Sequence, residues 1–368
     1  MRLHNIAAIA RKEVRHLVRD ARSLALMFLL PAMMLFLYGY AIRLDIVDAP
    51  IGLLQESHDA LSNELAAHFE ATPAFRVMRH FHDRRELADA VTAHEVWAVI
   101  VIPADFATSL GRGAARVQLI LDGLDANSAR LMRNYVLQLV NDHALRLAAQ
   151  PGRVTVEYRP WFNETNESRY AIVPGVIVMV MGVVGALMTS LTIAREIESG
   201  NLVMLRTTPL TRSEFLLGKL LPYFVVGMID VMGCVAAAVF IFDVPLRGSL
   251  IELAGASALF LLVVMTQGAL ISLVAGTQIL AAQLVQVTTF LPAFLLSGVI
   301  YAIANMPVAM QVVTAAVPAR YYVALIKALF LKGATLATLW VEVGALLAVL
   351  LVLAALLARR ADRLGLRR

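Results

Sequence analysis

Long apolar runs separated by short polar segments dominate the chain. A helix that crosses a bilayer needs about 20 mainly apolar residues, and six stretches are close to or above that length. They cover residues 24–42, 171–194, 216–242, 252–275, 281–303 and 336–358. The pattern therefore predicts a polytopic α-helical membrane protein with six transmembrane helices.

The segment before the first span, residues 1–23, has a different pattern. Arg11, Arg15 and Arg19 share one face of a helix, and apolar residues recur on another face at three- and four-residue steps. The apolar positions are Leu3, Ile6, Ala10, Val14 and Leu17. This pattern predicts a cytoplasmic basic amphipathic helix that lies in the membrane interface beside anionic lipid. A short helix that packs on protein is the alternative.

Residues 43–170 interrupt the apolar pattern and hold most of the acidic residues. Strand-like runs occur at residues 49–54, 75–81, 96–102, 116–121 and 153–158, and helical runs at 60–70, 84–93, 103–110 and 128–149. Strands that alternate with helices predict an α/β sheet domain, and the length suffices for a core of its own. We expect this domain between the first two spans, on the extracytoplasmic side.

The distribution of Lys and Arg in short loops predicts how the spans are oriented. Bases precede the first span and also fill the tail 359–368, so both termini are expected in the cytoplasm, together with the loop 195–215. Residues 304–335 would then lie outside, although they carry three bases. Because this stretch is apolar and contains two prolines, we expect a re-entrant or interfacial helical segment.

Composition supports the membrane class and excludes other functions. Charged residues make up only 16% of the 368 residues, against about 25% in soluble proteins. The net charge of +5 comes from bases beside apolar segments, so we expect no nucleic-acid partner. The one cysteine, Cys234, excludes a disulfide within the chain. No cleavable signal peptide is evident before the first span.

No motif for catalysis is present in the sequence. The only Gly-Lys dipeptide, at Gly218 and Lys219, lacks the glycine-rich loop that cradles phosphates. We therefore expect neither an ATPase site nor a bound cofactor in this chain. His80 and His82 are too few for a metal site, which needs three or four converging ligands.

Polar residues inside predicted spans are costly and are candidates for function. Asp230 lies mid-span in the third span, and Glu342 lies near the start of the last one. Gln267, Gln283 and Gln286 make the fourth and fifth spans polar. Asp230 and the three glutamines are candidates to line a substrate pathway. Hydrogen bonds between helices are the alternative, and the safer interpretation.

The loop between the second and third spans is the most informative segment. It reads as a charged helix end, a break at Gly200, a short helix with an apolar face, and Thr208-Pro209 before the next span. Ser213 is expected to cap the helix that starts near Glu214. A short loop with this much predicted structure is suited to docking a partner protein.

This loop resembles that of ABC-2 type transporter permease subunits, in particular the bacterial subfamily with a large periplasmic domain between spans one and two. The matching residues are Arg195, Glu196, Glu198, Gly200, Leu205, Thr208, Pro209, Glu214, Gly218 and Lys219. Asn201 and Val203 depart from the family pattern, which has Thr and Glu there. Segments 161–175 and 296–333 also resemble the family.

The resemblance implies an exporter in the bacterial inner membrane, in which two permease subunits pair with two ATPase subunits that bind ATP and Mg²⁺. The loop would dock on the ATPase and transmit its closure to the spans. The residues that the resemblance assigns to this coupling are Arg195, Glu196, Ile197, Glu198, Gly200, Leu202, Leu205, Thr208, Pro209 and Leu210. By analogy, a periplasmic adaptor or an outer-membrane channel is a further candidate partner.

The exported compound is expected to be hydrophobic or amphiphilic, because the spans hold few polar groups. Two other functions stay open. One is an ATPase-driven protein that transmits motion to its periplasmic domain without substrate flux. The other is a secondary transporter driven by an ion gradient, which would need convergent ionisable groups near the middle of the membrane.

Overall fold

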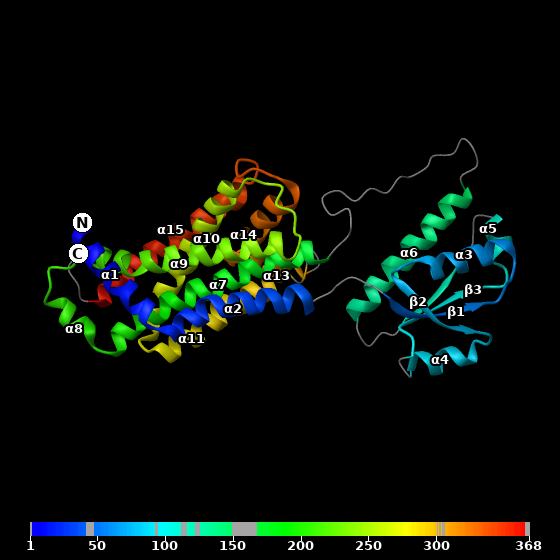
Figure 1. The fold of residues 1–368 in the computed structure, drawn as a ribbon, viewed down its shortest axis with the longest axis horizontal. Coiled ribbons are helices and arrows are strands. Elements are labelled where there is room, and N and C mark those ends of the chain that lie inside the picture. Colours follow the sequence, from blue (N-terminus) through cyan, green and yellow to red (C-terminus); the bar gives the residue numbers. More distant parts are fainter. Residues whose placement is uncertain are drawn as a thin grey trace. The chain divides into compact units, whose positions relative to one another are not determined.

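The chain forms two compact units, Met1–Ile42 with Glu167–Arg368 (unit 1) and Arg43–Asn166 (unit 2). The structure is a computed structural model, in which Figure 1 shows the ribbon. It describes residues 2–41, 48–92, 95–111, 116–121, 126–148, 168–299, 301, 303 and 306–364.

Unit 2 is an α/β domain built on a four-stranded sheet. The strands are β1 (Ala49–Gln55), β2 (Phe75–Phe81), β3 (Ala98–Ile102) and β4 (Gln118–Leu121). Their order is β2-β1-β3-β4, with β1 parallel to both neighbours and β4 antiparallel to β3. The helices are α3 (Ala60–Ala71), α4 (Arg85–Thr92), α5 (Phe106–Gly111) and α6 (Ala126–Ala148). Strands and helices alternate as the sequence predicts; the expected strand at 153–158 lies outside the described residues.

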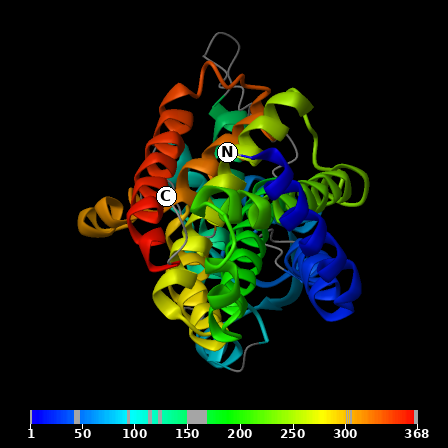
Figure 2. The ribbon, with the colours of Figure 1, turned by 90° about the vertical axis from the view of Figure 1, so that its left-hand side faces the viewer.

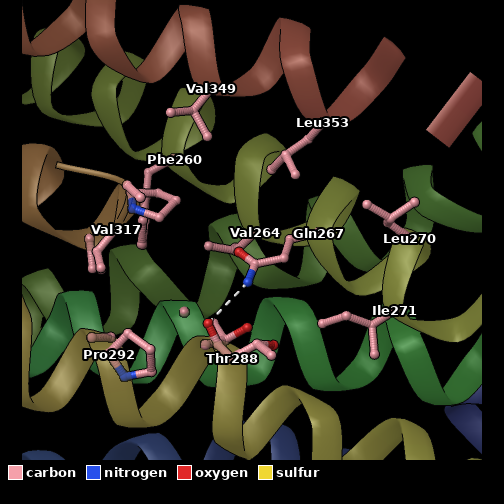
Figure 3. A pocket seen from close by; sticks show the side chains of 16 residues that line it. Phe260, Val264, Gln267, Leu270, Ile271, Thr288, Pro292, Val317, Val349 and Leu353 are labelled. Carbon is pink, nitrogen blue, oxygen red and sulfur yellow. Dashed lines mark hydrogen bonds between the residues drawn. The ribbon is translucent and has the colours of Figure 1, made fainter. Parts of the chain in front are cut away.

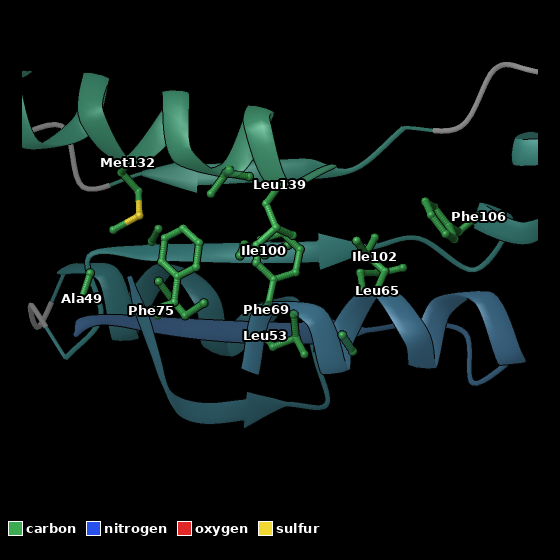
Figure 4. Close-up of a cluster of buried hydrophobic side chains, with 14 residues drawn as sticks. Ala49, Leu53, Leu65, Phe69, Phe75, Ile100, Ile102, Phe106, Met132 and Leu139 are labelled. Carbon is green, nitrogen blue, oxygen red and sulfur yellow. The ribbon is translucent and has the colours of Figure 1, made fainter. Parts of the chain in front are cut away.

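Each face of this sheet has a core of its own, because successive side chains of a strand point to opposite faces. On one face Leu53 and Ile100 pack with Phe69 of α3 and Leu139 of α6, as Figure 4 shows. On the other face Leu54, Val99 and Val101 pack with Leu87 and Ala90 of α4. All five residues of β3 are buried, as expected for a strand that is covered on both sides.

Unit 1 is built from helices joined by short loops among its described residues. Its first helices are α1 (Leu3–Arg19), α2 (Ala21–Ala41), α7 (Ser168–Glu198), α8 (Asn201–Arg206), α9 (Arg212–Phe240) and α10 (Leu250–Ala275). They are followed by α11 (Gln278–Val285), the π-helix η1 (Gln286–Phe290), α12 (Leu291–Leu296), α13 (Val308–Thr314), α14 (Pro318–Lys327), the π-helix η3 (Ala328–Lys332), α15 (Trp340–Arg360) and the 3₁₀-helix η4 (Ala361–Leu364).

Among the described residues, five helical segments are long and apolar enough to cross a membrane, and a sixth if one bent pair counts as a single span. The five are Ile172–Glu198, Arg212–Phe240, Leu250–Ala275, Gln278–Leu296 and Trp340–Arg360. They correspond to the second to sixth predicted spans. Helix α2 covers the first predicted span, but its apolar part, Met27–Tyr40, is shorter than the others. The structure is thus that of a membrane-type helical protein with five to six apolar helices.

The bent pair falls in the segment predicted to be re-entrant. The chain turns by 85° between Val308–Thr314 and Pro318–Lys332. Arg320 fastens the bend, since its Nη1 donates to the Thr314 hydroxyl at 2.6 Å and to the Gln311 carbonyl at 3.1 Å. These bonds satisfy the Arg320 guanidinium and the Gln311 carbonyl at the turn.

Helix α7 lies at the centre of unit 1 and contacts α2, α9, α10, α11 and α14. Viewed along the bundle, the blue α1 and α2 and the red α15 lie on opposite sides of it (Figure 2). Its closest neighbour is α10, where a Cβ added at Gly268 would lie only 2.3 Å from the Ala186 carbonyl oxygen. Small residues at such contacts allow close helix packing in membranes.

Candidate functional site

The loop between α7 and α9 folds into the short helix α8 with a defined break on each side. Gly200 takes a left-handed conformation, with φ of 72°, which a residue without Cβ adopts freely. After α8, the capping box of α9 joins Thr211 and Glu214: the Glu214 N–H donates to Thr211 Oγ1, and the Thr211 N–H donates to Glu214 Oε2. The prediction that Ser213 caps this helix is wrong. Ser213 is already the second residue of α9, two positions after the N-cap Thr211.

Helix α8 has one buried and one exposed side. Leu202 and Leu205 pack into a core with Leu210 and Phe215 and with Leu357 of α15. That core also takes in Ile197 as a partly buried neighbour. Four of the predicted coupling residues therefore face the protein interior and hold α8 against the rest of unit 1. They are Ile197, Leu202, Leu205 and Leu210.

The exposed side of α8 presents residues that the sequence analysis did not select. Val203 and Met204 are 65% and 74% exposed, and Thr207, Thr208 and Pro209 are exposed beside them. Of these, only Thr208 and Pro209 were predicted coupling residues. The sequence could have predicted this exposure. In one helix, side chains at positions 202 and 205 that point inward place positions 203 and 204 on the outer side.

The exposed loop is bound to η4, the 3₁₀-helix that directly follows α15. Arg206 Nε donates to the Leu364 carbonyl at 3.1 Å, and Arg212 forms an ion pair with Asp362. The Thr208 hydroxyl donates to the Leu205 carbonyl at 2.6 Å and satisfies the end of α8. Figure 1 places α8 at the same end of unit 1 as α1.

Glu196, the first acid of the loop motif, is buried in a cluster of charges rather than exposed. Its Oε1 lies 3.0 Å from Lys219 Nζ and 2.9 Å from Lys12 Nζ. Lys219 Nζ also lies 2.8 Å from Glu13 Oε1. The cluster joins α1, α7 and α9, and its two ammonium groups balance two carboxylates, which buried charges require.

Two further motif residues also hold α1. A Cβ added at Gly218 would lie 2.8 Å from Ile9 Cβ, so only glycine lets α1 approach α9 this closely. Glu214 Oε1 accepts the Arg2 N–H at 2.6 Å, and its Oε2 accepts from Asn5 Nδ2 at 3.0 Å. Glu196, Glu214, Gly218 and Lys219 thus bind α1 to the start of α9.

The packed face of α1 matches the predicted apolar face only in part, at Ile6, Ala10 and Leu17. Glu13 and Leu17 are buried and Ile6 and Ile9 half-buried, whereas Leu3 and Val14, at 81% and 46% exposure, face outward. The buried face includes an acid, which a count of apolar positions does not find, because its partner Lys219 lies in another helix.

Arg195 and Glu198 connect the end of α7 to α11. Glu198 Oε2 accepts from the backbone N–H of Gln278 at 3.1 Å and from its Nε2 at 3.0 Å. Arg195 lies 2.8 Å from His16 Nε2 and donates from Nε to Gln278 Oε1 at 3.3 Å. Both side chains therefore position neighbouring helices at this end of unit 1.

The four predicted pathway residues do not come together at one site. Asp230 is buried in α9 near Met27, Met188 and Met265, and its carboxyl forms no hydrogen bond or ion pair with the described residues. Gln267 lines a separate, larger cavity. The Gln283 and Gln286 side chains are exposed and line neither cavity. Glu342 is half-buried in the first turn of α15.

The larger cavity has a volume of about 340 Å³ and lies among α7, α10, η1, α12, the start of α14, and α15. Figure 3 shows its apolar wall and the hydrogen bond from Gln267 Nε2 to the Thr288 carbonyl, which is 3.2 Å long. Within the described part of the chain, no group of three or more His, Cys, Asp or Glu side chains is placed to hold a metal ion.

Comparison with known proteins agrees with the apolar helices and the loop motif. A family model described as "ABC-2 family transporter protein" matches residues 21–359. The chain belongs to the ABC-2 transporter family. The "Probable multidrug ABC transporter permease YbhS" of Escherichia coli (strain K12) is 36% identical over 335 residues, 89% of either chain. The "Probable multidrug ABC transporter permease YbhR" of the same organism is 29% identical over 351 residues, 94% of this chain and 95% of that one.

Membership of this family defines the general role of the chain. It is a membrane-embedded permease subunit of an ABC transporter and not an enzyme, and an ABC permease works with an ATPase partner. The match includes α2, α7, the loop with α8, and α15. The buried charge cluster and the exposed side of α8 are therefore features of a transport subunit.

Proposed function

We propose that this permease is the membrane subunit of an ATP-driven exporter of hydrophobic or amphiphilic compounds, in the inner membrane of a bacterium. The observation that carries the proposal is the exposed apolar pair Val203 and Met204 on α8, a helix whose other side is fixed to the protein. An exposed apolar pair on a supported helix suits a groove on a partner protein. The two relatives are named as probable multidrug permeases, which agrees with an exporter.

The contacts of α8 with the rest of unit 1 would let it transmit movement of the ATPase to the spans. When the ATPase binds ATP and Mg²⁺ and closes, it would push on the exposed side of α8. The push would reach α7 and α9 directly, because both helices run from this loop into the apolar bundle. The cluster of Lys12, Glu13, Glu196 and Lys219 would make α1 move with them, since separating these charges is costly.

We further propose six spans, with α2 as the first and both termini in the cytoplasm. The cluster that joins α8 to α15 and to Ile9 of α1 supports this topology, because it gathers both ends of unit 1 at one end of the helices. Unit 2 would then be periplasmic, and the bent pair α13–α14 would be re-entrant from that side. Basic residues in α1 and at the end of α15 favour the cytoplasmic side for the α8 end.

A second permease subunit would cover the exposed glutamines. Gln283 and Gln286 lie on an apolar span beside exposed Ile279 and Val287. Amide side chains that face lipid are unfavourable, whereas they hydrogen-bond well between helices or beside a water-filled pathway. This face is therefore the proposed contact with the second subunit and one wall of the pathway. A periplasmic adaptor or an outer-membrane channel would meet unit 2.

The test is co-purification of the ATPase with a variant of α8 and with a matched control. Met204→Glu places an acid on the proposed contact, and we expect at least a tenfold loss of bound ATPase. Leu3→Glu is the control, because it adds the same side chain at an apolar position of α1 that is 81% exposed but lies outside α8, and it should keep the ATPase. Equal binding by both variants would exclude α8 as the contact. Failure of the wild-type permease to bind any ATPase would overturn the proposed function.

A separate measurement addresses the substrate. Vesicles that contain the assembled transporter should move an amphiphilic dye against its gradient when ATP is added. ATP hydrolysis without dye flux would instead favour a protein that transmits motion to unit 2. Flux driven by an ion gradient alone would contradict ATP coupling and direct attention to Asp230.

A further inference from the structure

The cavity around Gln267 is lined by helices of a single chain and is partly open. Its volume of about 340 Å³ falls at the lower end of the range for small-molecule sites, roughly 300–1,000 Å³. Of the described residues that line it, none carries a charge. A site of this kind offers nothing to neutralise a charged ligand and favours an uncharged one, because an unpaired charge is costly in apolar surroundings.

The polar groups of the cavity come from the π-helix η1 and from Gln267 of α10. A π-helix changes the backbone hydrogen-bond pattern locally and is frequent at functional sites. Here the Thr288 carbonyl in η1 accepts from Gln267 Nε2 of α10, which orients the glutamine amide at the cavity wall. Gln267 Oε1 accepts no hydrogen bond from the described residues and is left for a ligand.

Thr289 is the second polar group, and it is left unpaired. The residue is only 6% exposed, it lines the cavity, and its hydroxyl has no hydrogen-bond partner among the described residues. Buried hydroxyls are nearly always hydrogen-bonded in folded proteins. The oxygen itself has almost no exposed surface, so it reaches a bound molecule only when the threonine side chain rotates towards the cavity.

We propose that this cavity binds an uncharged amphiphilic molecule, or the uncharged part of one. Its apolar body would fill the space between Phe260 and Leu353, and one polar group would hydrogen-bond to the Thr289 hydroxyl and the Gln267 amide. The proposal rests on the proposed function, because it assigns a substrate class to the exporter. The proposed function places one wall of the pathway at the exposed Gln283 and Gln286, where a second subunit would contact this one. The binding site proposed here instead lies within one subunit.

Gly182 of α7 provides a way to fill the cavity. It lines the wall, and a Cβ there would lie 3.8 Å from Thr289 Cγ2 and 3.9 Å from Phe260 Cζ, which are ordinary contact distances. A leucine side chain at this position would extend into the space without displacing backbone. Gly233 of α9 is a matched control, since no atom lies within 4 Å of a Cβ built there.

The test uses benzophenone, an uncharged photoreactive ketone whose carbonyl accepts a hydrogen bond. The purified permease–ATPase complex is irradiated with benzophenone, and the labelled peptides are identified by mass spectrometry. We expect saturable labelling of α10 and of the η1–α12 segment. A trimethylammonium derivative of benzophenone should label these peptides at least tenfold less.

Two variants test the site itself. Gly182→Leu should abolish the saturable labelling, and Gly233→Leu should keep it. Thr289→Val keeps the shape but removes the hydroxyl, and it should weaken benzophenone binding about fivefold, as the loss of one hydrogen bond predicts. Because that hydroxyl has no partner in the protein, Thr289→Val should not lower the unfolding temperature.

Other outcomes would overturn the proposal. Labelling spread evenly over lipid-facing helices, or unchanged by Gly182→Leu, would show that the cavity binds nothing. Equal labelling by the charged derivative would refute the preference for uncharged molecules. The experiment measures binding without ATP, so failure of labelling in a complex that retains its ATPase would refute this site and leave the proposed function intact.

Discussion

Lys219 of α9 and Glu13 of α1 form a buried ion pair, with 2.8 Å between Lys219 Nζ and Glu13 Oε1. The side chains are 3% and 1% exposed, and Glu196 of α7 shares the same ammonium group at 3.0 Å. The pair binds the N-terminal helix α1 to α9, next to the proposed coupling loop. Motif residues that would be natural candidates for contact with an ATPase are thereby used inside the permease.

Removal of the shared cation should destabilise the permease strongly. Lys219→Met leaves the buried carboxylates of Glu13 and Glu196 with one ammonium group, that of Lys12, in place of two. We therefore expect a loss of about 3–5 kcal/mol in the free energy of unfolding. Thermal unfolding in detergent measures the effect. Arg11→Met is the control, since it removes an exposed positive charge from α1 and should change little. A Lys219→Met protein as stable as wild type would contradict the role of the cluster.

The close contact between Gly218 of α9 and Ile9 of α1 predicts that a larger side chain at position 218 would detach α1 from α9. In Gly218→Leu the new side chain meets Ile9 and the Ile6 carbonyl, so α1 must move away from α9. Trypsin should then cleave after Arg11 and Arg15 several times faster than in the wild type. Gly233→Leu adds the same side chain where there is space and should leave cleavage unchanged. Equal protection of the two variants would show that α1 does not depend on this contact.

The proposed subunit contact at the exposed glutamines can be tested by cross-linking. Cys234 is the only cysteine, so Cys234→Ala provides a cysteine-free background. Gln283→Cys or Gln286→Cys should form a disulfide-linked dimer, with itself or with a similarly labelled second permease, when copper phenanthroline is added to membranes. Leu351→Cys on α15 is the control, because its side chain is also 69% exposed but lies on another helix. Cross-links only at Leu351→Cys would place the contact elsewhere.

In unit 2, the start of α3 should depend on pH through Asp59. The Ser57 hydroxyl and the Ser62 N–H and hydroxyl donate to its carboxylate, and these bonds lower the pKa of Asp59 from 3.8 to about 2. A lowered pKa in the folded state adds stability that is complete above about pH 4 and is lost as the pH falls towards about 2.

Hydrogen exchange at the Ser62 amide, corrected for its intrinsic pH dependence, measures this effect. Protection should decline between about pH 4 and about pH 2. At neutral pH, Asp59→Ala should lower the protection of this first turn, because the N-cap acceptor is lost. Protection that stays constant down to about pH 2 would contradict the assigned bonds.

The sequence by itself determined the elements that depend on local pattern. Bilayer thickness requires long apolar runs, so the second to sixth spans could be located before any packing was known. Strand and helix periodicity placed β1 to β4, and the loop motif indicated the family that the comparisons then showed. Leu202 and Leu205 were named only as coupling residues that the family resemblance implies, whereas the structure packs both into the core behind α8.

Only the tertiary structure decided how the motif residues are used. Glu13 and Lys219 are 206 positions apart, and whether an acid is exposed or paired depends on which helix packs against it. The inward direction of Glu196 follows from that packing. The cavity at Thr289 likewise needs a π-helix, two prolines and α10 in contact with one another, an arrangement that depends on helix packing rather than on local periodicity.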